Sequence, residues 1–238
     1  MRVATVIAAL GVQAVAMVAC ATTGDDPGAR GASAPTSESS SVSSEDSARD
    51  EQEAVRRSFE RYRRALLARD GETAAGLVSE RLRTYYVELR DRALHADEAE
   101  VRKLRLADKY AVASIRVRFD AADIQGLSGR EMIALAVDAG LIGRDGVEGV
   151  EVASVRISGP HTATLSADTA EGARVDFQYR LEGGEWRIDF TELLELANDF
   201  LERFADEQDL TDDEFIVQTL TSLTGQRVTV EEIYEPMV

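Results

Sequence analysis

Residues 174–190 read RVDFQYRLEGGEWRIDF, with two adjacent glycines between two alternating patterns. Apolar residues stand at every second position before the two glycines, with polar residues between them, which is the pattern of a strand with one buried face. This apolar set is Val175, Phe177, Tyr179 and Leu181. Gly183-Gly184 supplies a two-residue turn, and Trp186, Ile188 and Phe190 continue the alternation. The stretch therefore predicts an antiparallel hairpin.

Two further strands are predicted before this hairpin. After Gly149 the apolar period changes from 3.6 to 2, and a strand runs from Val150 through Ile157 with a bulge near Ala153. Gly159-Pro160 makes a turn, and residues 161–168 form the next strand. The sequence thus predicts a meander of four antiparallel strands.

Helical patterns surround these strands. Residues 51–70 place Val55, Phe59, Tyr62 and Leu66 on one helical face, Gly71 ends that helix, and a second helix covers about 72–93. Shorter helices are predicted near 97–100, over 108–119 and over 130–139. Thr191 caps a helix to about residue 204, Thr211 with Glu214 forms a capping box before one that ends at Gly225, and residues 227–234 are extended. The fold class is therefore α+β, with residues 51–238 as one domain.

The order of these elements resembles a known superfamily. Helices precede a meander that ends in residues 182–190, EGGEWRIDF, and the run Ala68-Arg69-Asp70-Gly71-Glu72 interrupts the first two helices. Over about residues 51–191 this is similar to the nuclear transport factor 2-like (cystatin-like) superfamily. The resemblance implies a curved sheet wrapped by helices into a cone. The insertion at 97–143 and the helices after Thr191 depart from that pattern.

The N-terminal region indicates where the protein resides. Residues 3–19 form an apolar run behind Arg2, as in a signal peptide over residues 1–19. Met17-Val18-Ala19-Cys20 resembles the lipobox of bacterial lipoproteins, although Met17 stands where leucine is usual. The resemblance implies lipidation of Cys20, anchoring in the cell envelope, and an outer-membrane location facing the periplasm in a Gram-negative cell. An ordinary cleaved signal is the alternative.

Residues 20–50 are interpreted as a tether. Residues 21–50 are rich in Ser, Ala, Gly and acids and have no aromatic residue, so they cannot bury enough apolar surface to offset the entropy of ordering. We expect a disordered spacer there.

Composition excludes several function classes. The net charge of −17 argues against a nucleic-acid partner, and a single cysteine excludes an intrachain disulfide and a cysteine-rich zinc site. With only His95 and His161 present, we expect no metal site and no cofactor.

Charge is unevenly distributed along the chain. Residues 51–120 carry 16 basic and 13 acidic side chains, a net charge of +3, whereas residues 191–238 carry 2 and 13, a net charge of −11. The arginines of the first helix could bind an anionic partner. We expect the simpler alternative, in which this helix packs near the acidic C-terminal helices.

Candidate site residues are few. Ketosteroid isomerases of the superfamily place an aspartate with a tyrosine or histidine inside the cone, but no motif here aligns with theirs. Asp176, Asp189 and Tyr179 are the catalytic candidates, although the aspartates also fit a solvated or salt-bridged sheet face with Arg174, Arg180 or Arg187 as partners. The ligand-binding candidates are Tyr62, Tyr85 and Tyr86, for which core packing is the alternative.

Three functional hypotheses remain open. The first is a non-enzymatic envelope lipoprotein whose domain binds a partner protein or a small apolar ligand. The second is an isomerase- or dehydratase-like enzyme with an aspartate in a cone-shaped pocket. The third is a structural assembly factor without a pocket. A deep cavity with an aspartate in hydrogen-bond reach of a tyrosine would favour the enzyme.

Overall fold

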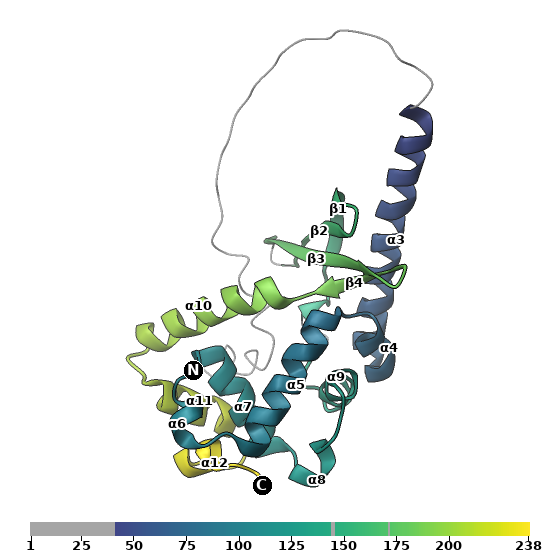
Figure 1. Ribbon diagram of the computed structural model, residues 1–238. Helices are drawn as coiled ribbons and strands as arrows, with labels where there is room; N and C mark the ends of the chain where they lie inside the picture. Colours follow the sequence, from purple (N-terminus) through teal and green to yellow (C-terminus); the bar gives the residue numbers. More distant parts are fainter. Residues whose placement is uncertain (1–40, 144–145, 171) are drawn as a thin grey trace.

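The computed structural model describes residues 41–143, 146–170 and 172–238, and it confirms the α+β class. Helices come first along the chain, four consecutive strands form one antiparallel sheet, and further helices follow (Figure 1). The predicted lipidation residue Cys20 lies outside the described residues. Among the described residues no helix is both long and apolar enough to cross a membrane.

The sheet is the predicted meander. Its strands are β1 (Glu151–Gly159), β2 (Thr162–Asp168), β3 (Arg174–Glu182) and β4 (Glu185–Asp189), adjacent in that order. Gly183 and Gly184 both have positive φ, 60° and 83°, as the two-residue hairpin turn requires. The register of β1 and β2 shifts between Val152 and Ser154, which confirms the bulge near Ala153.

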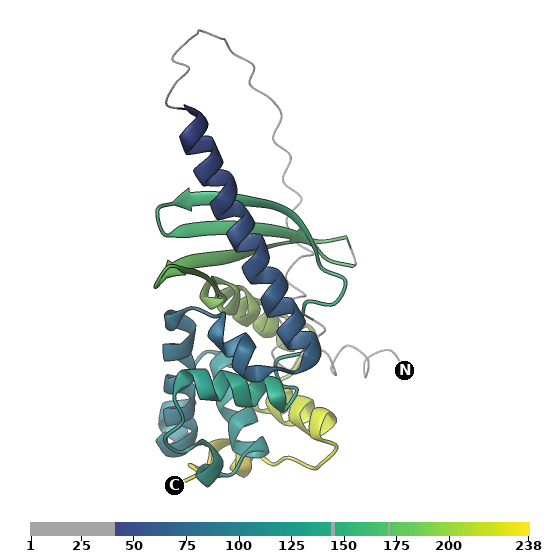
Figure 2. The ribbon, with the colours of Figure 1, turned by 90° about the vertical axis from the view of Figure 1, so that its right-hand side faces the viewer.

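Helix α3 (Ser41–Ala68) lies across one face of the sheet (Figure 2). Phe59 is fully buried, and its ring centre lies 5.4 Å from that of Phe177 in β3. The Ser58 hydroxyl donates to the carbonyl of Trp186 at 2.7 Å, which ties the helix to β4. The helix begins at Ser41, so residues 41–50, predicted as part of the disordered spacer, are helical instead.

The predicted helix over residues 72–93 is two helices. They are α4 (Gly71–Gly76) and α5 (Glu80–His95), and Val78 between them forms a parallel bridge with Ile188 at the edge of β4. Ser79 then caps α5 by accepting from the N–H of Leu82. The left-handed residue that follows α3 is Arg69, with φ 55°, and Gly71 instead begins α4.

The remaining helices form a second layer. They are α6 (Glu98–Val101), α7 (Leu106–Arg118), α8 (Ala121–Ile124), α9 (Gly129–Asp138), α10 (Thr191–Glu207), α11 (Asp212–Thr224) and α12 (Val230–Tyr234). The Thr211–Glu214 capping box is confirmed, and Gly225 ends α11 in the left-handed conformation. Two predictions were wrong: residues 230–234 are helical behind a capping box from Thr229, and the cap residue of α10 is Phe190.

Arg116 of α7 joins the ends of two helices, α5 and α12. Its guanidinium donates to the carbonyls of Ala93 at 3.0 Å, Arg92 at 3.0 Å and Ala96 at 2.6 Å, all at the end of α5. It also donates to the carbonyl of Ile233 in α12 at 3.1 Å. Because the last carbonyls of a helix lack intrahelical donors, one half-buried arginine here replaces two C-terminal caps.

The molecule has two hydrophobic cores. The sheet-side core gathers residues of α3, α4, the four strands and part of α9. The helix-side core gathers residues of α5, α7, α10, α11 and α12. Tyr85 and Tyr86 of α5 pack against both cores, so the seam between the cores runs past the middle of α5.

The charge asymmetry is also a separation in space. Helix α3 makes its main contacts with α4 and the sheet, whereas the acidic helices α10 and α11 pack against α7 at the other end of the molecule (Figure 1). The acidic helices pair instead with residues of the insertion, as in Lys109 to Asp212 at 2.6 Å and Arg105 to Asp199 at 3.0 Å. The expectation that α3 packs near the acidic helices holds only for the apolar start of α10, where Leu194 and Tyr62 line one cavity, and within the described residues no ion pair joins α3 to α10 or α11.

Candidate functional site

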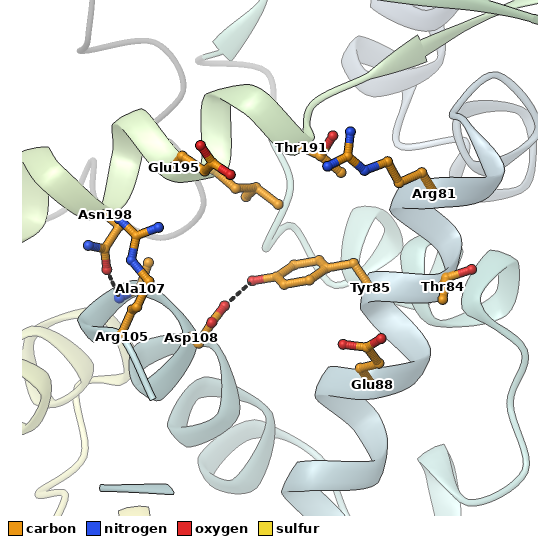
Figure 3. Close-up of a pocket in the computed structure, with 11 residues that line it drawn as sticks. Arg81, Thr84, Tyr85, Glu88, Arg105, Ala107, Asp108, Thr191, Glu195 and Asn198 are labelled. Atoms are coloured by element: carbon orange, nitrogen blue, oxygen red, sulfur yellow. Dashed lines mark hydrogen bonds between the residues drawn. The ribbon is translucent and has the colours of Figure 1, made fainter. Parts of the chain in front are cut away.

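A groove of about 430 Å³ opens between α5, α7 and α10 (Figure 3). We call it the seam groove, because it lies where the two cores meet. It is lined by Arg81, Thr84, Tyr85 and Glu88 of α5, by Arg105, Ala107 and Asp108 at the start of α7, and by Thr191, Leu194, Glu195 and Asn198 of α10. Most of these side chains are polar, so the groove suits a polar or charged group.

Tyr85 and Asp108 meet in the seam groove. The Tyr85 hydroxyl donates to Oδ1 of Asp108 at 2.7 Å, and Figure 3 shows both side chains pointing into the space between α5 and α7. Burial raises the pKa of the Tyr85 hydroxyl, and the Asp108 carboxylate raises it further. Tyr85 is therefore a neutral donor at physiological pH. Asp108 lies in the first turn of α7, where the helix dipole stabilises a carboxylate.

A buried amide builds the opposite wall. Asn198 of α10 is 2% exposed, and its Oδ1 accepts from the N–H of Ala107 at 3.1 Å. Its Nδ2 donates to Oε1 of Glu202 at 2.7 Å. Arg105, the N-cap residue of α7, makes no capping hydrogen bond with its own side chain, so Asn198 caps that helix from a distant segment. This bond fixes α10 against α7 and keeps the groove in shape.

Charged side chains of both signs line the rim. Arg105 pairs with Asp199, and Glu88 pairs with Arg92 at 3.6 Å. Within the described part of the chain, Arg81 and Glu195 form no ion pair with any residue. Both line the groove and can turn to a polar group bound there.

Two apolar cavities adjoin the groove. One of about 100 Å³ lies among α5, α7, α9 and α10, and one of about 60 Å³ lies between α3, the sheet, α5, residues 142–143 and residues 146–147. Leu194 lines both cavities and the groove, so its side chain separates the polar space from the two apolar ones. Tyr85 is shared by the groove and the larger cavity, and Tyr86 is shared by the two cavities.

Two tyrosines line the smaller cavity. Tyr62, only 5% exposed, and Tyr86 both line it, and neither hydroxyl has a hydrogen-bond partner among the described residues. Burial raises the pKa of both groups, and the neighbouring Tyr86 adds to the rise at Tyr62. Both are therefore neutral at physiological pH and could donate to an acceptor on a bound group.

The predicted ligand-binding residues therefore gather at one place, whereas the predicted catalytic residues do not. Tyr62, Tyr85 and Tyr86 each line at least one of these three spaces. None of Asp176, Asp189 and Tyr179 lines any of them. Tyr179 is 1% exposed, and its hydroxyl has no partner among the described residues.

Asp189 and Asp176 accept hydrogen bonds from residues in or next to the sheet. Asp189 accepts from Nε of Arg180 at 2.6 Å, and from the N–H and hydroxyl of Thr191 at 3.0 and 2.6 Å. Burial alone would raise the pKa of Asp189, but the hydrogen bonds from Thr191 and Arg180 outweigh it and lower that pKa. Asp176 lies exposed on the outer face of β3 and accepts from the Ser166 hydroxyl at 2.5 Å.

Sequence reasoning missed Asp108, Leu194 and Asn198. An aspartate in a first helical turn is ordinarily a solvated charge, and the sequence places Asp108 23 residues from Tyr85 with no motif between them. In the described part of the chain, no group of three or more His, Cys, Asp or Glu side chains could hold a metal ion. Comparisons with protein-family models, curated proteins and solved structures give no match.

Proposed function

We propose that this chain is a lipid-anchored protein of the bacterial cell envelope whose folded domain binds a small amphipathic molecule without transforming it. The lipobox-like residues Met17–Cys20 support the anchor. One observation carries the binding function: a polar groove of about 430 Å³ adjoins two apolar cavities, and Leu194 borders all three.

The three spaces suit different parts of one molecule. Its polar head lies in the seam groove, beside Arg81, Glu195 and the Tyr85–Asp108 pair. Its apolar part passes Leu194 into the cavities behind. An apolar cavity of about 150 Å³ holds benzene, so cavities of about 60 and 100 Å³ each take only a short apolar group until Leu194 rotates.

A titration with a fluorescent amphiphile tests this proposal. The full chain in a non-ionic detergent is titrated with a dansyl-labelled medium-chain carboxylate. Leu194→Trp fills the junction of the three spaces and is expected to weaken binding at least about tenfold, close to 1.4 kcal/mol. Leu196→Trp is the matched control, because Leu196 lies two residues away on α10 and is 46% exposed.

The proposal fails if the probe does not bind, or if both tryptophan variants bind it as well as the wild type does. An amine of the same chain length, titrated in parallel, shows whether Arg81 or Glu195 determines the preferred head group.

One observation supports the alternative that the protein is an enzyme. Tyr85 and Asp108 are hydrogen-bonded at 2.7 Å inside the largest of these spaces. Asp108 would accept a proton from a bound substrate, and Tyr85 would donate to the charge that develops. If Asp108→Asn abolished turnover of a bound compound while binding persisted, the enzyme would replace the binding protein. An assembly factor without a pocket has less support, since the groove is large.

A further inference from the structure

The first turns of α3 project from the domain without packing on it. Figures 1 and 2 show this end of the helix extending beyond the edge of the sheet. Residues 46–51 are all exposed, and Val55 is the first buried residue in the part of α3 whose side chains the structure describes, from Asp46 onward. A helical segment of only a few turns is marginally stable in water when nothing packs against it. The exposed start of the 28-residue helix α3 would therefore be stabilised by contact with a partner.

The exposed face of α3 carries charges that change sign along its length. The face consists of Asp46, Asp50, Glu53, Arg57, Arg61 and Arg64, spaced at intervals of three and four residues, and all six are exposed. Such spacing places side chains on one side of a helix. The three acidic residues come first, and the three arginines follow.

This order holds for the helix as a whole. Residues 46–53 carry four acidic and one basic side chain, a net charge of −3, whereas residues 56–69 carry six basic and one acidic, a net charge of +5. The ion pairs within this region are weak: Asp46–Arg49, Glu53–Arg57 and Glu60–Arg63 span 3.6, 3.6 and 3.7 Å, and all three are partly exposed. Arg61 and Arg64 form no ion pair with any described residue.

We propose that this face is a homotypic interface, on which the α3 helices of two copies lie antiparallel. The acidic half of one helix then faces the basic half of the other, twice, about a two-fold axis near residue 55. Such an interface is self-complementary, as a two-fold axis requires. A parallel pair would instead place like charges side by side.

The geometry leaves room for the second copy. The buried side of α3, with Phe59 and Tyr62, packs on its own sheet, so the charged side points away from the domain. In an antiparallel pair the two domains lie on opposite outer sides and at opposite ends. The helix is about 42 Å long, so two such helices offer an extended contact.

Sedimentation equilibrium of the full chain in density-matched non-ionic detergent tests the proposal. We expect a reversible dimer whose association constant falls at least about tenfold as salt rises from about 0.05 M to 0.5 M. One variant carries Asp46→Arg, Asp50→Arg and Glu53→Arg, and the other carries Arg57→Glu, Arg61→Glu and Arg64→Glu. Each alone is expected to be monomeric, and an equimolar mixture is expected to restore a dimer.

A matched control makes the same charge change elsewhere. Asp206→Arg, Glu207→Arg and Glu235→Arg reverse three exposed acids away from α3, and this variant is expected to dimerise like the wild type. Thermal unfolding checks that each variant is folded, and the single exchanges Asp50→Arg and Arg61→Glu repeat the test if a triple variant is not. A monomeric wild type, a dimer insensitive to salt, or variants that still dimerise alone would overturn the proposal.

Discussion

The sheet-side core and the helix-side core of this molecule are held together in different ways. On the sheet side, neighbouring strands pair in sequence order and one helix covers them, so most contacts follow from local alternation. On the helix side, short helices are joined by side chains that reach across the chain, such as Arg116 and Asn198. The seam groove lies between the two cores, and α5, α7 and α10 form its walls.

We expect the largest loss of stability when one aromatic ring is removed from either core. Phe177→Ala on the sheet side and Phe215→Ala on the helix side should each cost about 4 kcal/mol, because both rings are almost completely buried. Urea unfolding is followed by the fluorescence of Trp186, the only tryptophan, and by circular dichroism of the helices. We expect Phe215→Ala to lower the midpoint seen by circular dichroism more than that seen by Trp186. Coincident shifts would mean a single cooperative core.

Removing the Arg116 guanidinium should have the next largest effect. Arg116→Met keeps much of the aliphatic volume but leaves carbonyls at the ends of α5 and α12 without donors. We expect a loss of about 3 kcal/mol in the free energy of unfolding, since hydrogen bonds from a charged donor are stronger than average. Arg102→Met is a control on the exposed side of the same layer. If both variants lost the same free energy of unfolding, Arg116 would contribute no more to stability than Arg102 does.

Substitution of Gly129 tests how closely α9 packs against α5 at the seam. A Cβ atom there would lie 2.0 Å from the carbonyl oxygen of Arg83, so α9 must move away from α5. Gly129→Ala should cost about 2 kcal/mol by overpacking. Gly126→Ala tests backbone strain without a clash, because Gly126 has φ 83° and open space around it. An unchanged midpoint for Gly129→Ala would contradict the close approach of these helices.

The smallest expected effect is a pH dependence at the join of β4 and α10. The pKa of Asp189 is lower when folded, so its contribution to stability is present above the ordinary value of 3.8 and is lost as pH falls below it. The stability difference between wild type and Asp189→Asn should therefore shrink as pH decreases from about 5 through that value. A difference that does not change with pH would show that the Asp189 charge contributes nothing.

Local pattern predicted the sheet side well. Alternation in residues 174–190 and the two glycines specify the hairpin, because strand period and turn conformation depend on neighbouring residues. The same reasoning failed at Val78, where a bridge to Ile188 outweighs the helical pattern of the flanking residues. It also missed the helix at Val230–Tyr234, although Thr229 and Glu232 form a capping box that could have been recognised.

The candidate site was only half predictable. Tyrosines at 62, 85 and 86 stood out by residue type, and all three line the cavities. Asp108, Leu194 and Asn198 gain their roles from the packing of α7 and α10 against α5, and no spacing in the sequence encodes that contact. Asp189 drew attention as an acid among apolar residues, and its hydrogen bonds explain it as a structural group.

Hydrogen–deuterium exchange with and without the dansyl-labelled carboxylate shows whether the ligand binds at the seam between the two cores. We predict slower exchange in α5 and α10 when the probe is bound, and no change in the hairpin of β1 and β2, which lines neither the groove nor the two cavities. Protection confined to the outer face of the sheet, or no protection at saturating probe, would mean that the seam is not the binding site.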